Sequence, residues 1–532
     1  MMRRQPHPHE ASVNDRPLRH VRHTGGLSWR VLTLCLALAP CFGAPAPAAA
    51  QQAPATVELT LERMVELGLD DSYRVRQLQL GVERRRSLLR AQQADLRSRV
   101  YLNIATPEFR AISDEKWNSD LGRNEIVHTN TRLWEMDLSV RQPVMLLGYP
   151  TNGYLSLNNR VYRYSQLGNS DEVNYYNRYF VAYEQPLFQP NRMRNSLEEA
   201  RLNLESAELD YLDDVVRVID DLADDYYDLF EDAFRIRVAE DRVDALEQVG
   251  EIADELAAEN AARRIDIDQL EVELANAREQ TQQARSGFRR QAEDIKQRLR
   301  LQPSDSIVVD PVADVRPVPV DVERAIELAK TLVPRMREIE ISRRRGEISL
   351  EETEGRNSFR MDLAVSYGRE MQDPRFQQLW GEPRNSYTVR LNGYVPVWDW
   401  GARANRIQAQ EYSIRQTDLR MEEAHSQIET NVRSVIRNLA DFEERALNME
   451  TNLELARRNT AAALMRYRAG EASLLDVLQT INQEAATTVN FLDAYLGYRN
   501  SLLRLQDLTY YDFEHDASLL DRFGIDPSAS QR

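Results

Sequence analysis

A single helical pattern of about seventy residues, from about Gly401 to Ala469, constrains this chain more than any other feature. At a rise of about 1.5 Å per residue such a helix is roughly 100 Å long, far longer than a globular core requires. The pattern is interrupted at Tyr467-Arg-Ala-Gly470, and a new apolar period begins at Leu474. Because glycine adopts positive φ at little cost, Gly470 predicts a tight turn between two antiparallel helices.

The same arrangement occurs earlier in the chain. Pro186 and Phe188 end an alternating segment and lie 210 positions before Pro396 and Trp398, which end another. A helical pattern follows the first of these segments too, and a break in it is predicted at Arg264 to Asp268.

Segments upstream of the strands also repeat, but at a different spacing. Leu61-Glu62-Arg63 is matched 261 positions later by Val322-Glu323-Arg324. The chain is therefore predicted to contain two tandem repeats. The predicted divisions are a first repeat at 51–301, a linker at 302–320 rich in Pro, Val and Asp, a second repeat at 321–510, and a mobile tail at 511–532.

The N-terminal segment is predicted to direct export. A short apolar run from Val31 to Ala39 follows basic residues and precedes Ala48-Ala-Ala50, which predicts a signal peptide over residues 1–50. A lipoprotein signal ending at Cys41 is an alternative, although Pro40 fits it poorly. Both cysteines lie in this leader, so no disulfide is expected after cleavage.

Alternating segments follow the first helical region. They predict strands with one apolar and one polar face around Trp134 to Val140 and Tyr179 to Glu184, and around Met361 to Tyr367 and Tyr387 to Leu391. Val100 to Ile104 and Tyr154 to Val161 are further candidates, and residues 106–178 could add strands or form a long surface loop.

No apolar run after the leader is long enough for a membrane helix, so any membrane contact must come from strands. Two strands per half, four in all, cannot close a barrel, and open sheet edges in lipid leave backbone groups unpaired. Several chains must then share one wall, and three chains would give a twelve-stranded barrel. Apolar residues at coiled-coil spacing, such as Leu474, Leu478 and Ile481, suggest a ring of helices continuing that ring of strands.

The leader, the tandem halves, Gln185-Pro-Leu-Phe188, Val395-Pro-Val-Trp-Asp-Trp-Gly401 and Tyr467-x-x-Gly470-x-x-Ser473-x-x-Asp476 together resemble the TolC-like outer-membrane efflux proteins. The resemblance runs from about Leu59 to Tyr510. It implies an α+β membrane protein in the outer membrane of a Gram-negative bacterium. The assembly it implies is a homotrimer with a twelve-stranded β-barrel continued by a twelve-helix periplasmic α-barrel.

The resemblance also implies a function and partners. Such proteins are passive exit ducts of tripartite efflux or type I secretion systems for small molecules or polypeptides. They dock a periplasmic adaptor and an inner-membrane transporter of the RND or ABC type, and they contact outer-membrane lipid. Neither a cofactor nor a metal is implied. The net charge of −17 also argues against a nucleic-acid partner.

Three groups of site residues follow from the resemblance. In the family, rings of aspartate narrow the periplasmic aperture. The corresponding positions here are Asp476 and Gln479, and Gln479 departs from the family's aspartate. Asp268 and Glu271 occupy the equivalent places of the first half. The helix-hairpin turns, where an adaptor would dock, contain Tyr467, Gly470, Ser473 and Arg264. The strand-to-helix junctions contain Pro186, Phe188, Pro396, Trp398 and Gly401.

Asp476 has a simpler explanation as well, because an acidic residue is favoured in the first turn of any helix. No catalytic motif is present, so an enzyme is not expected. The main alternative function is a periplasmic adaptor, which also combines a signal peptide, a helical hairpin and β structure. An adaptor would normally carry one hairpin and a lipoyl-type sheet, whereas this sequence predicts two hairpins that each follow amphipathic strands.

Overall fold

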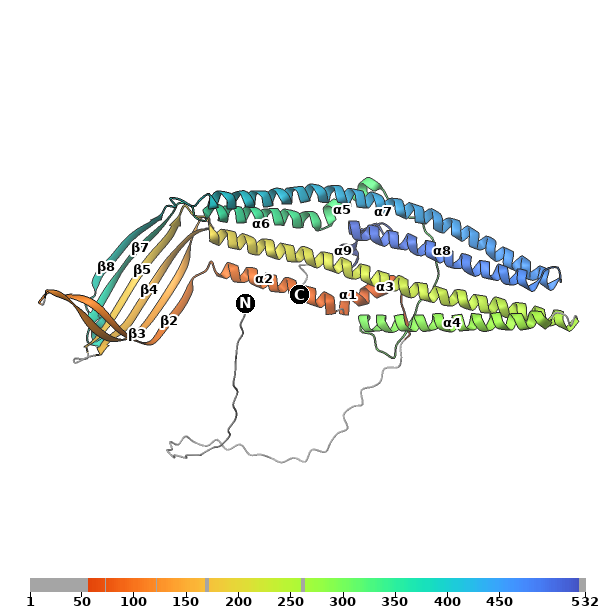
Figure 1. Cartoon of the computed structure of the whole chain (residues 1–532), viewed down its shortest axis with the longest axis horizontal. Coiled ribbons are helices and arrows are strands. Elements are labelled where there is room, and N and C mark those ends of the chain that lie inside the picture. The colour runs from red at the N-terminus through yellow and green to blue at the C-terminus, as the bar shows by residue number, and fades with distance from the viewer. Residues whose placement is uncertain (1–55, 72, 121, 168–171, 260–263, 526–532) are drawn as a thin grey trace, which may run out of the picture. The chain divides into compact units, whose positions relative to one another are not determined.

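The alternating segments form one antiparallel sheet of six strands in the order β2-β3-β4-β5-β7-β8 (Figure 1). This computed structural model describes residues 56–71, 73–120, 122–167, 172–259 and 264–525, all within one unit, Pro54–Arg532. The predicted signal peptide lies outside the described residues. The strands are β2 (Arg99–Asn118), β3 (Arg123–Leu146), β4 (Tyr149–Leu167), β5 (Glu172–Leu187), β7 (Arg360–Asp373) and β8 (Arg384–Tyr394).

The predicted count of four strands is wrong. Each strand coincides with an alternating segment, but the first half of the chain contributes four strands and the second half two. Residues 106–178 are therefore not one long surface loop, because β3 and β4 are paired with each other over most of their length. The two halves are joined in the sheet by the pairing of β5 with β7, in which Val181 lies opposite Tyr367.

The helices form two long hairpins and two shorter pairs. The first half contains α1 (Leu61–Asp71), α2 (Tyr73–Ala94), α3 (Arg192–Glu259) and α4 (Arg264–Leu299). The second half contains α5 (Val322–Leu332), α6 (Arg335–Gly355), α7 (Ala402–Arg468) and α8 (Leu474–Thr509). The long helix predicted from Gly401 to Ala469 is thus confirmed as α7, within one residue at each end.

Element bounds repeat at the two spacings found in the sequence. α1 and α5 begin 261 positions apart, as do β2 and β7. α3 and α7 begin 210 positions apart, and α4 and α8 both begin and end 210 positions apart. The spacing therefore changes between the start of β2 and the start of α3, which is where the two additional strands lie.

The long helices pack side by side. One part of α3 contacts α2, for example through Arg86 and Glu208, and the other part contacts α4, through Arg298 and Asp225. α7 contacts α6 and then α8 in the same way. α3 also contacts α6 and α8, so these helices form one layer. In this layer α2 and α4 lie on one side, and α7 lies on the other.

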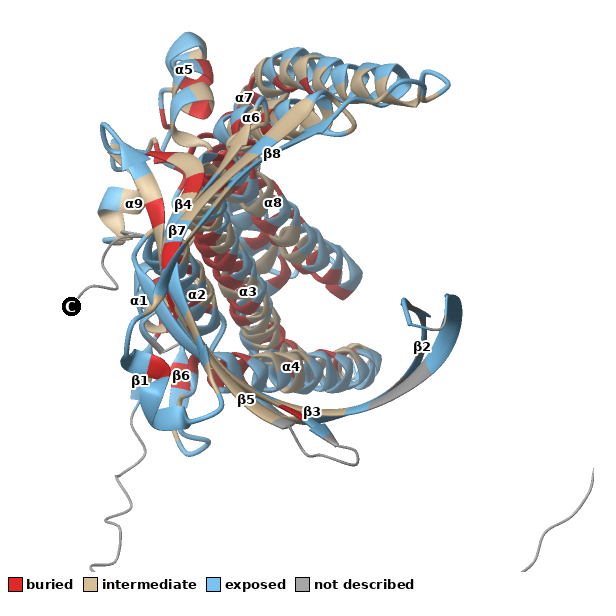
Figure 2. Ribbon diagram, turned by 90° about the vertical axis from the view of Figure 1, so that its left-hand side faces the viewer, coloured by how far each residue is buried: buried red, intermediate tan, exposed pale blue. Residues whose placement is uncertain are grey.

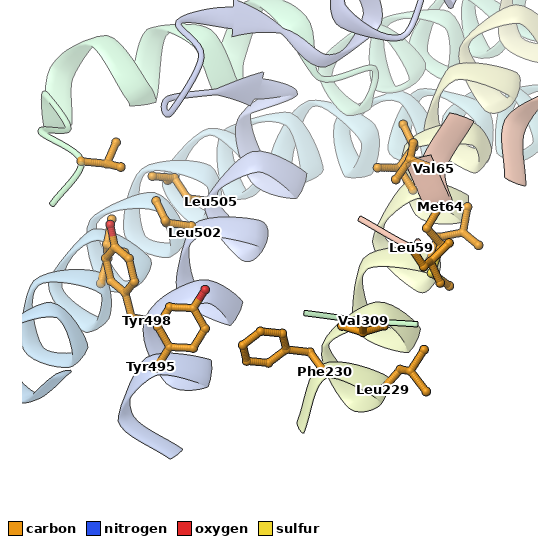
Figure 3. Close-up of a cluster of buried hydrophobic side chains, with 14 of the residues drawn as sticks. Leu59, Met64, Val65, Leu229, Phe230, Val309, Tyr495, Tyr498, Leu502 and Leu505 are labelled. Carbon is orange, nitrogen blue, oxygen red and sulfur yellow. The ribbon is translucent and has the colours of Figure 1, made fainter. Parts of the chain in front are cut away.

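The main hydrophobic core lies midway along the helices. Figure 3 shows Phe230 of α3 pointing toward Tyr495 of α8, with ring centroids 5.7 Å apart. Leu229, Leu492 and Leu505 are also fully or almost fully buried in this cluster. Burial is concentrated on such helices, whereas much of the sheet is exposed (Figure 2).

Short elements complete this core. The strand β1 (Thr56–Glu58) pairs in parallel with β6 (Ser306–Val308), so the predicted linker 302–320 contains a strand, and its Ile307 and Val315 are buried. Residues 511–525 form β9 (Tyr511–Asp512), β10 (Ala517–Ser518) and α9 (Leu519–Arg522). This part of the predicted tail is folded, where mobility was expected, because Tyr511 and Leu519 are buried and Asp512 bonds Arg522.

Candidate functional site

The two faces of the sheet differ sharply in chemistry. The cross-strand register places apolar residues opposite one another, such as Leu102 with Leu138 and Val365 with Val389. The large and exposed residues on this face include Val100, Leu102, Ile104, Trp134, Met136, Leu138, Leu155, Leu157, Val181, Tyr367, Tyr387, Val389 and Leu391. An exposed apolar surface that extends over all six strands is typical of contact with lipid or protein.

The opposite face is polar, and several of its groups are paired. Arg160 contacts Glu135 at 3.0 Å and Asp137 at 3.3 Å. The buried Ser139 hydroxyl donates a 2.6 Å hydrogen bond to Asn158 Oδ1. A sheet with one apolar and one polar, hydrogen-bonded face can separate lipid from water.

The second strand-to-helix junction connects β8 to α7 and contains the predicted residues Pro396, Trp398 and Gly401. Gly401 has φ 77° and Trp400 has φ 58°, so the chain turns sharply before the helix begins. Asp399 stabilises the turn by accepting hydrogen bonds from the Arg403 amide at 2.9 Å and the Gly401 amide at 3.0 Å. These bonds, that from Arg403 foremost, lower the pKa of Asp399.

The first junction connects β5 to α3. Pro186 is the second last residue of β5, and Phe188 follows with φ 57°. Asn191 Oδ1 accepts a hydrogen bond of 3.1 Å from the Arg194 amide at the start of α3, in the manner of an N-terminal cap. Asp399 and Asn191 thus perform similar functions at the two junctions. Neither residue was predicted as a site residue from the sequence, although an Asx residue just before a long helical pattern is a recognisable cap.

Both junctions expose large apolar side chains. The exposed fractions are 68% for Phe188, 73% for Trp398 and 87% for Trp400. Leu147, in the β3–β4 turn, is 92% exposed. Aromatic residues at the end of an apolar surface are characteristic of the boundary between a membrane and water.

The hairpin tip between α7 and α8 has the predicted turn. Tyr467 is fully buried, Gly470 has φ 76°, and Ser473 is the N-cap residue of α8. Asp476 accepts hydrogen bonds from the Ser473 hydroxyl at 2.8 Å and from its amide at 3.0 Å, and these bonds lower the pKa of Asp476. The simpler explanation of Asp476 as a helix-start residue is therefore correct for the single chain, and its exposed carboxylate remains ionised.

The break predicted at Arg264 to Asp268 in the first hairpin is wrong. α4 already begins at Arg264, so Arg264 and Asp268 are helical and do not form the break. The sequence Arg264-Ile-Asp266-Ile-Asp268 contains no glycine or proline, and its acidic residue Asp266 suits the first turn of a helix. The residues between α3 and α4 lie outside the described part of the chain.

The tips of the two hairpins pack together. Leu246 and Val249 of α3 lie in one cluster with Tyr467, Leu474 and Val477 of the second hairpin. The four residues predicted for the aperture, Asp476, Gln479, Asp268 and Glu271, are all exposed near these tips. A role at an aperture requires an assembly of several copies, since it needs these residues from each copy around one opening.

An acidic series on α3 was not recognised from the sequence. Asp220, Asp224, Asp228 and Asp232 recur every four residues and therefore share one face of the helix. Burial raises the pKa of each, followed by repulsion from other acidic groups, and the pKa of Asp220 reaches about 6. The four-residue spacing of these aspartates was the signal in the sequence that could have revealed the series.

One group of potential metal ligands occurs among the described residues, namely Asp512, Glu514 and His515. Asp512 bonds Arg522 and the His515 ring, and Glu514 bonds Arg499 at 3.1 Å. These contacts explain the group as part of the packing of the C-terminal segment. Within the described residues, no helix combines the length and apolar character that a membrane span requires.

The fold of the chain and part of its sequence both match those of known outer-membrane channels. The sequence profile described as outer membrane efflux protein matches residues 347–509, which extend from α6 to the end of α8. No curated protein matches the chain. The second half of the chain therefore contains an outer membrane efflux protein domain.

Solved structures with the same fold cover most of the chain. CusC has a TM-score of 0.62 at 12% identity, with 86% of this chain and 93% of that chain covered. The CmeC channel of Campylobacter jejuni has a TM-score of 0.61 at 13% identity, with 91% and 93% covered. The open MtrE channel of Neisseria gonorrhoeae has a TM-score of 0.54 at 13% identity, with 84% and 88% covered.

Together, these matches confirm the resemblance to TolC-like outer-membrane efflux proteins, and with it the α+β fold. The predicted outer-membrane location and efflux role agree with the family description. The alternative of a periplasmic adaptor with one hairpin is not the fold found, because the chain has two long hairpins and a six-stranded sheet.

Proposed function

We propose that three copies of this chain form one outer-membrane exit duct, whose sheets share a wall that continues into a ring of periplasmic helices. The duct carries small molecules or polypeptides passively from an inner-membrane transporter to the outside. The observation that supports this proposal best is that the described sheet ends in two edge strands, β2 and β8, and that both carry the same apolar surface.

Both edges of the sheet lie within the apolar surface. The edge strand β2 carries Val100, Leu102 and Ile104, and the edge strand β8 carries Tyr387, Val389 and Leu391, all exposed. Backbone groups of an edge strand in lipid must be paired, because each unpaired group costs several kcal/mol. Pairing between the β8 strand of one copy and the β2 strand of the next satisfies both edges at once.

The helices have corresponding open sides. α2 leads directly into β2, and β8 leads directly into α7, so each helix belongs to the same side as its strand. Exposed apolar residues recur seven or eight positions apart on α2 and α7 and on α4, which lies on the same side as α2. They are Leu80 and Leu88 on α2, Ile265 and Val272 on α4, and Tyr412 and Leu419 on α7. Such spacing is that of a coiled-coil seam without its partner helix.

The hairpin tips are the proposed docking surface for a periplasmic adaptor. Beside the buried Tyr467, the side chains of Met465 and Leu475 are 74% and 64% exposed. Exposed apolar residues that flank a rigid turn are suited to a protein partner. Asp476, Gln479, Asp268 and Glu271 belong, in this proposal, to the aperture between the tips of the three copies.

Fractionation and reconstitution test the proposal. The protein is expected in the outer-membrane fraction as a trimer that resists dissociation in unheated detergent gels, and purified trimers should produce conductance steps in planar bilayers. A monomer in the soluble periplasmic fraction would contradict both the trimeric assembly and the outer-membrane location.

Photo-crosslinking tests the docking surface. A photoreactive residue at Leu475, beside the hairpin tip, should capture an adaptor in cells. One at Leu447, which lies on α7 away from the tip, should capture none. Equal capture at both positions would remove the assignment of the tips.

A further inference from the structure

The six-stranded sheet contains a hairpin that the second half of the chain lacks. β2 and β7 begin 261 positions apart, whereas α3 and α7 begin 210 positions apart, so the first half holds 51 additional residues between these points (261 minus 210). β3 and β4, with the Leu147-Gly148 turn between them, occupy 45 of these residues, from Arg123 to Leu167. The β3–β4 hairpin is thus an additional unit between β2 and β5.

The pairing of the strands agrees with this assignment. In the second half, β7 pairs directly with β8, with Leu363 opposite Leu391. Their first-half counterparts, β2 and β5, are separated, because β2 pairs with β3 and β5 pairs with β4. The hairpin therefore lies within the sheet between these counterparts and does not cover one of its faces.

The hairpin is firmly attached beside the first junction. Gln185 Nε2 of β5 donates a 2.8 Å hydrogen bond to the Thr151 carbonyl of β4, and the Tyr183 hydroxyl donates one of 2.9 Å to Gln185 Oε1. Asn191 Nδ2, at the start of α3, donates to the Pro150 carbonyl at 2.5 Å. These side-chain bonds fix the turn end of the hairpin to the end of β5 and to the segment that follows it.

The hairpin also continues the apolar surface without a gap. Met136 and Leu138 of β3 lie opposite Ile104 and Leu102 of β2 on one side, and Val161 of β4 lies opposite Met136 on the other. From Trp134 to Val140 the apolar positions of β3 span about 20 Å along the strand at about 3.3 Å per residue, which at a tilt of about 40° covers roughly 15 Å of a lipid-facing band about 25 Å tall.

From these observations we infer that β3 and β4 are integral strands of the membrane wall. The seam between copies then joins β8 to β2 of the next copy, and three copies form a wall of eighteen strands. The inference rests on the proposed trimeric duct and corrects the twelve strands that the family resemblance implied. Because barrel diameter grows roughly in proportion to strand number, this wall is about 1.5 times as wide as a twelve-stranded one.

The exposed apolar residues of the two edge strands provide an expected register for the seam. β8 runs toward the helices and β2 runs away from them, so their pairing is antiparallel. Aligning the exposed apolar residues places Leu391, Val389 and Tyr387 opposite Val100, Leu102 and Ile104 of the next copy. All six side chains then face the same side as the rest of the apolar surface.

Disulfide trapping tests the seam, because the only natural cysteines are Cys35 and Cys41 in the predicted leader. Val389→Cys is combined with Val100→Cys, Leu102→Cys or Ile104→Cys, which allows for a shift in register. The matched control combines Val389→Cys with Leu155→Cys, Leu157→Cys or Val161→Cys on β4. Within one chain β4 is separated from β8 by two strands, roughly 14 Å in all, which is too far for a disulfide.

We expect the β2 series to give covalent dimers and trimers on oxidation, with no larger species, and a reductant should abolish them. Unheated gels of each variant confirm that the trimer still assembles. Trapping of the β4 series would overturn the eighteen-stranded wall, since the seam would then bypass β2 and β3, but it would leave the trimeric duct intact. Assembled trimers that are trapped in neither series would also overturn the seam, whereas a protein that is monomeric throughout would overturn the duct as well.

Discussion

The Ser473 amide donates a 3.0 Å hydrogen bond to the Asp476 carboxylate, and the Asp476 amide donates one of 3.3 Å back to the Ser473 hydroxyl. This reciprocal pair is a capping box, and it fixes the first turn of α8 at the hairpin tip. The same carboxylate is the proposed aperture charge. Its structural and transport roles can therefore be separated only by changing the two residues in turn.

Asp476→Ala should reduce the preference of the reconstituted channel for cations, because it removes one negative charge per copy from the narrow end. Ser473→Ala is the matched control, since it removes the cap at a cost of about 0.5 to 2 kcal/mol but keeps the charge. Single-channel reversal potentials in a salt gradient distinguish the two variants. An Asp476→Ala channel with wild-type selectivity would remove the aperture role.

Gly470→Ala should destabilise the hairpin by about 1 kcal/mol, because alanine is strained at φ 76°. Gly250→Ala, in the interior of α3 near the tip of the other hairpin, is the control of opposite sign. Its added Cβ meets only a Leu270 methyl at 3.4 Å, so better helix propensity should stabilise the chain by about 0.5 to 1 kcal/mol. Thermal melting of purified protein in detergent measures both changes, and equal shifts for the two would contradict the turn assignment.

Gly368→Ala should weaken the pairing of β5 with β7, which joins the two halves of the sheet. A Cβ at Gly368 would lie 2.3 Å from the Tyr179 carbonyl oxygen and 2.7 Å from the Phe180 Cα, and a backbone shift is needed to relieve such contacts. We expect a loss of about 1 to 3 kcal/mol and a lower yield of assembled protein. Gly393→Ala on β8 is the control, because its added Cβ meets nothing within 4 Å.

Asp220→Asn should stabilise the protein at neutral pH. Burial, with repulsion from Asp507 next, raises the pKa of Asp220 from 3.8 to about 6, so the ionised form is disfavoured in the folded state. This destabilisation of the folded state by ionised Asp220 is absent below pH 4, grows as pH rises toward 6, and is fully present at pH 7. Allowing for partial solvation, roughly 1 to 2 kcal/mol is expected at pH 7.

Melting temperatures of the wild type and Asp220→Asn at pH 4 and pH 7 test this sign. The gain should be present at pH 7 and small at pH 4. A gain of the same size at both values would show that the titration of Asp220 is not its cause.

The long helices were predictable because their apolar period persists over many turns, and Gly470 and Ser473 mark their ends. The strand number was harder to predict. On the apolar face of β4, Asn159 and Arg163 occupy positions that the alternation assigns to apolar residues, so the strand pattern is weak there. The difference between the two repeat spacings was visible in the sequence and already required additional residues in the first half.

Other features depended on three-dimensional contacts. The folding of residues 511–525 could not be predicted from local sequence, because it relies on distant partners such as Arg324, which bonds Asp516 at 2.9 Å. The hydrogen bonds of Gln185 to the β3–β4 hairpin likewise join residues 34 positions apart. By contrast, the junction prolines and Gly401 could be placed between a strand and a helix from the sequence, because abrupt changes from period two to helical period mark such positions locally.

The mass of the purified, membrane-extracted protein tests the central claim most directly, since a six-stranded open sheet cannot seal a pore alone. Native mass spectrometry in detergent should show one species with three times the mass of the processed chain. A stable species with the mass of a single chain, under conditions in which the protein remains folded, would contradict the shared wall and the duct that depends on it.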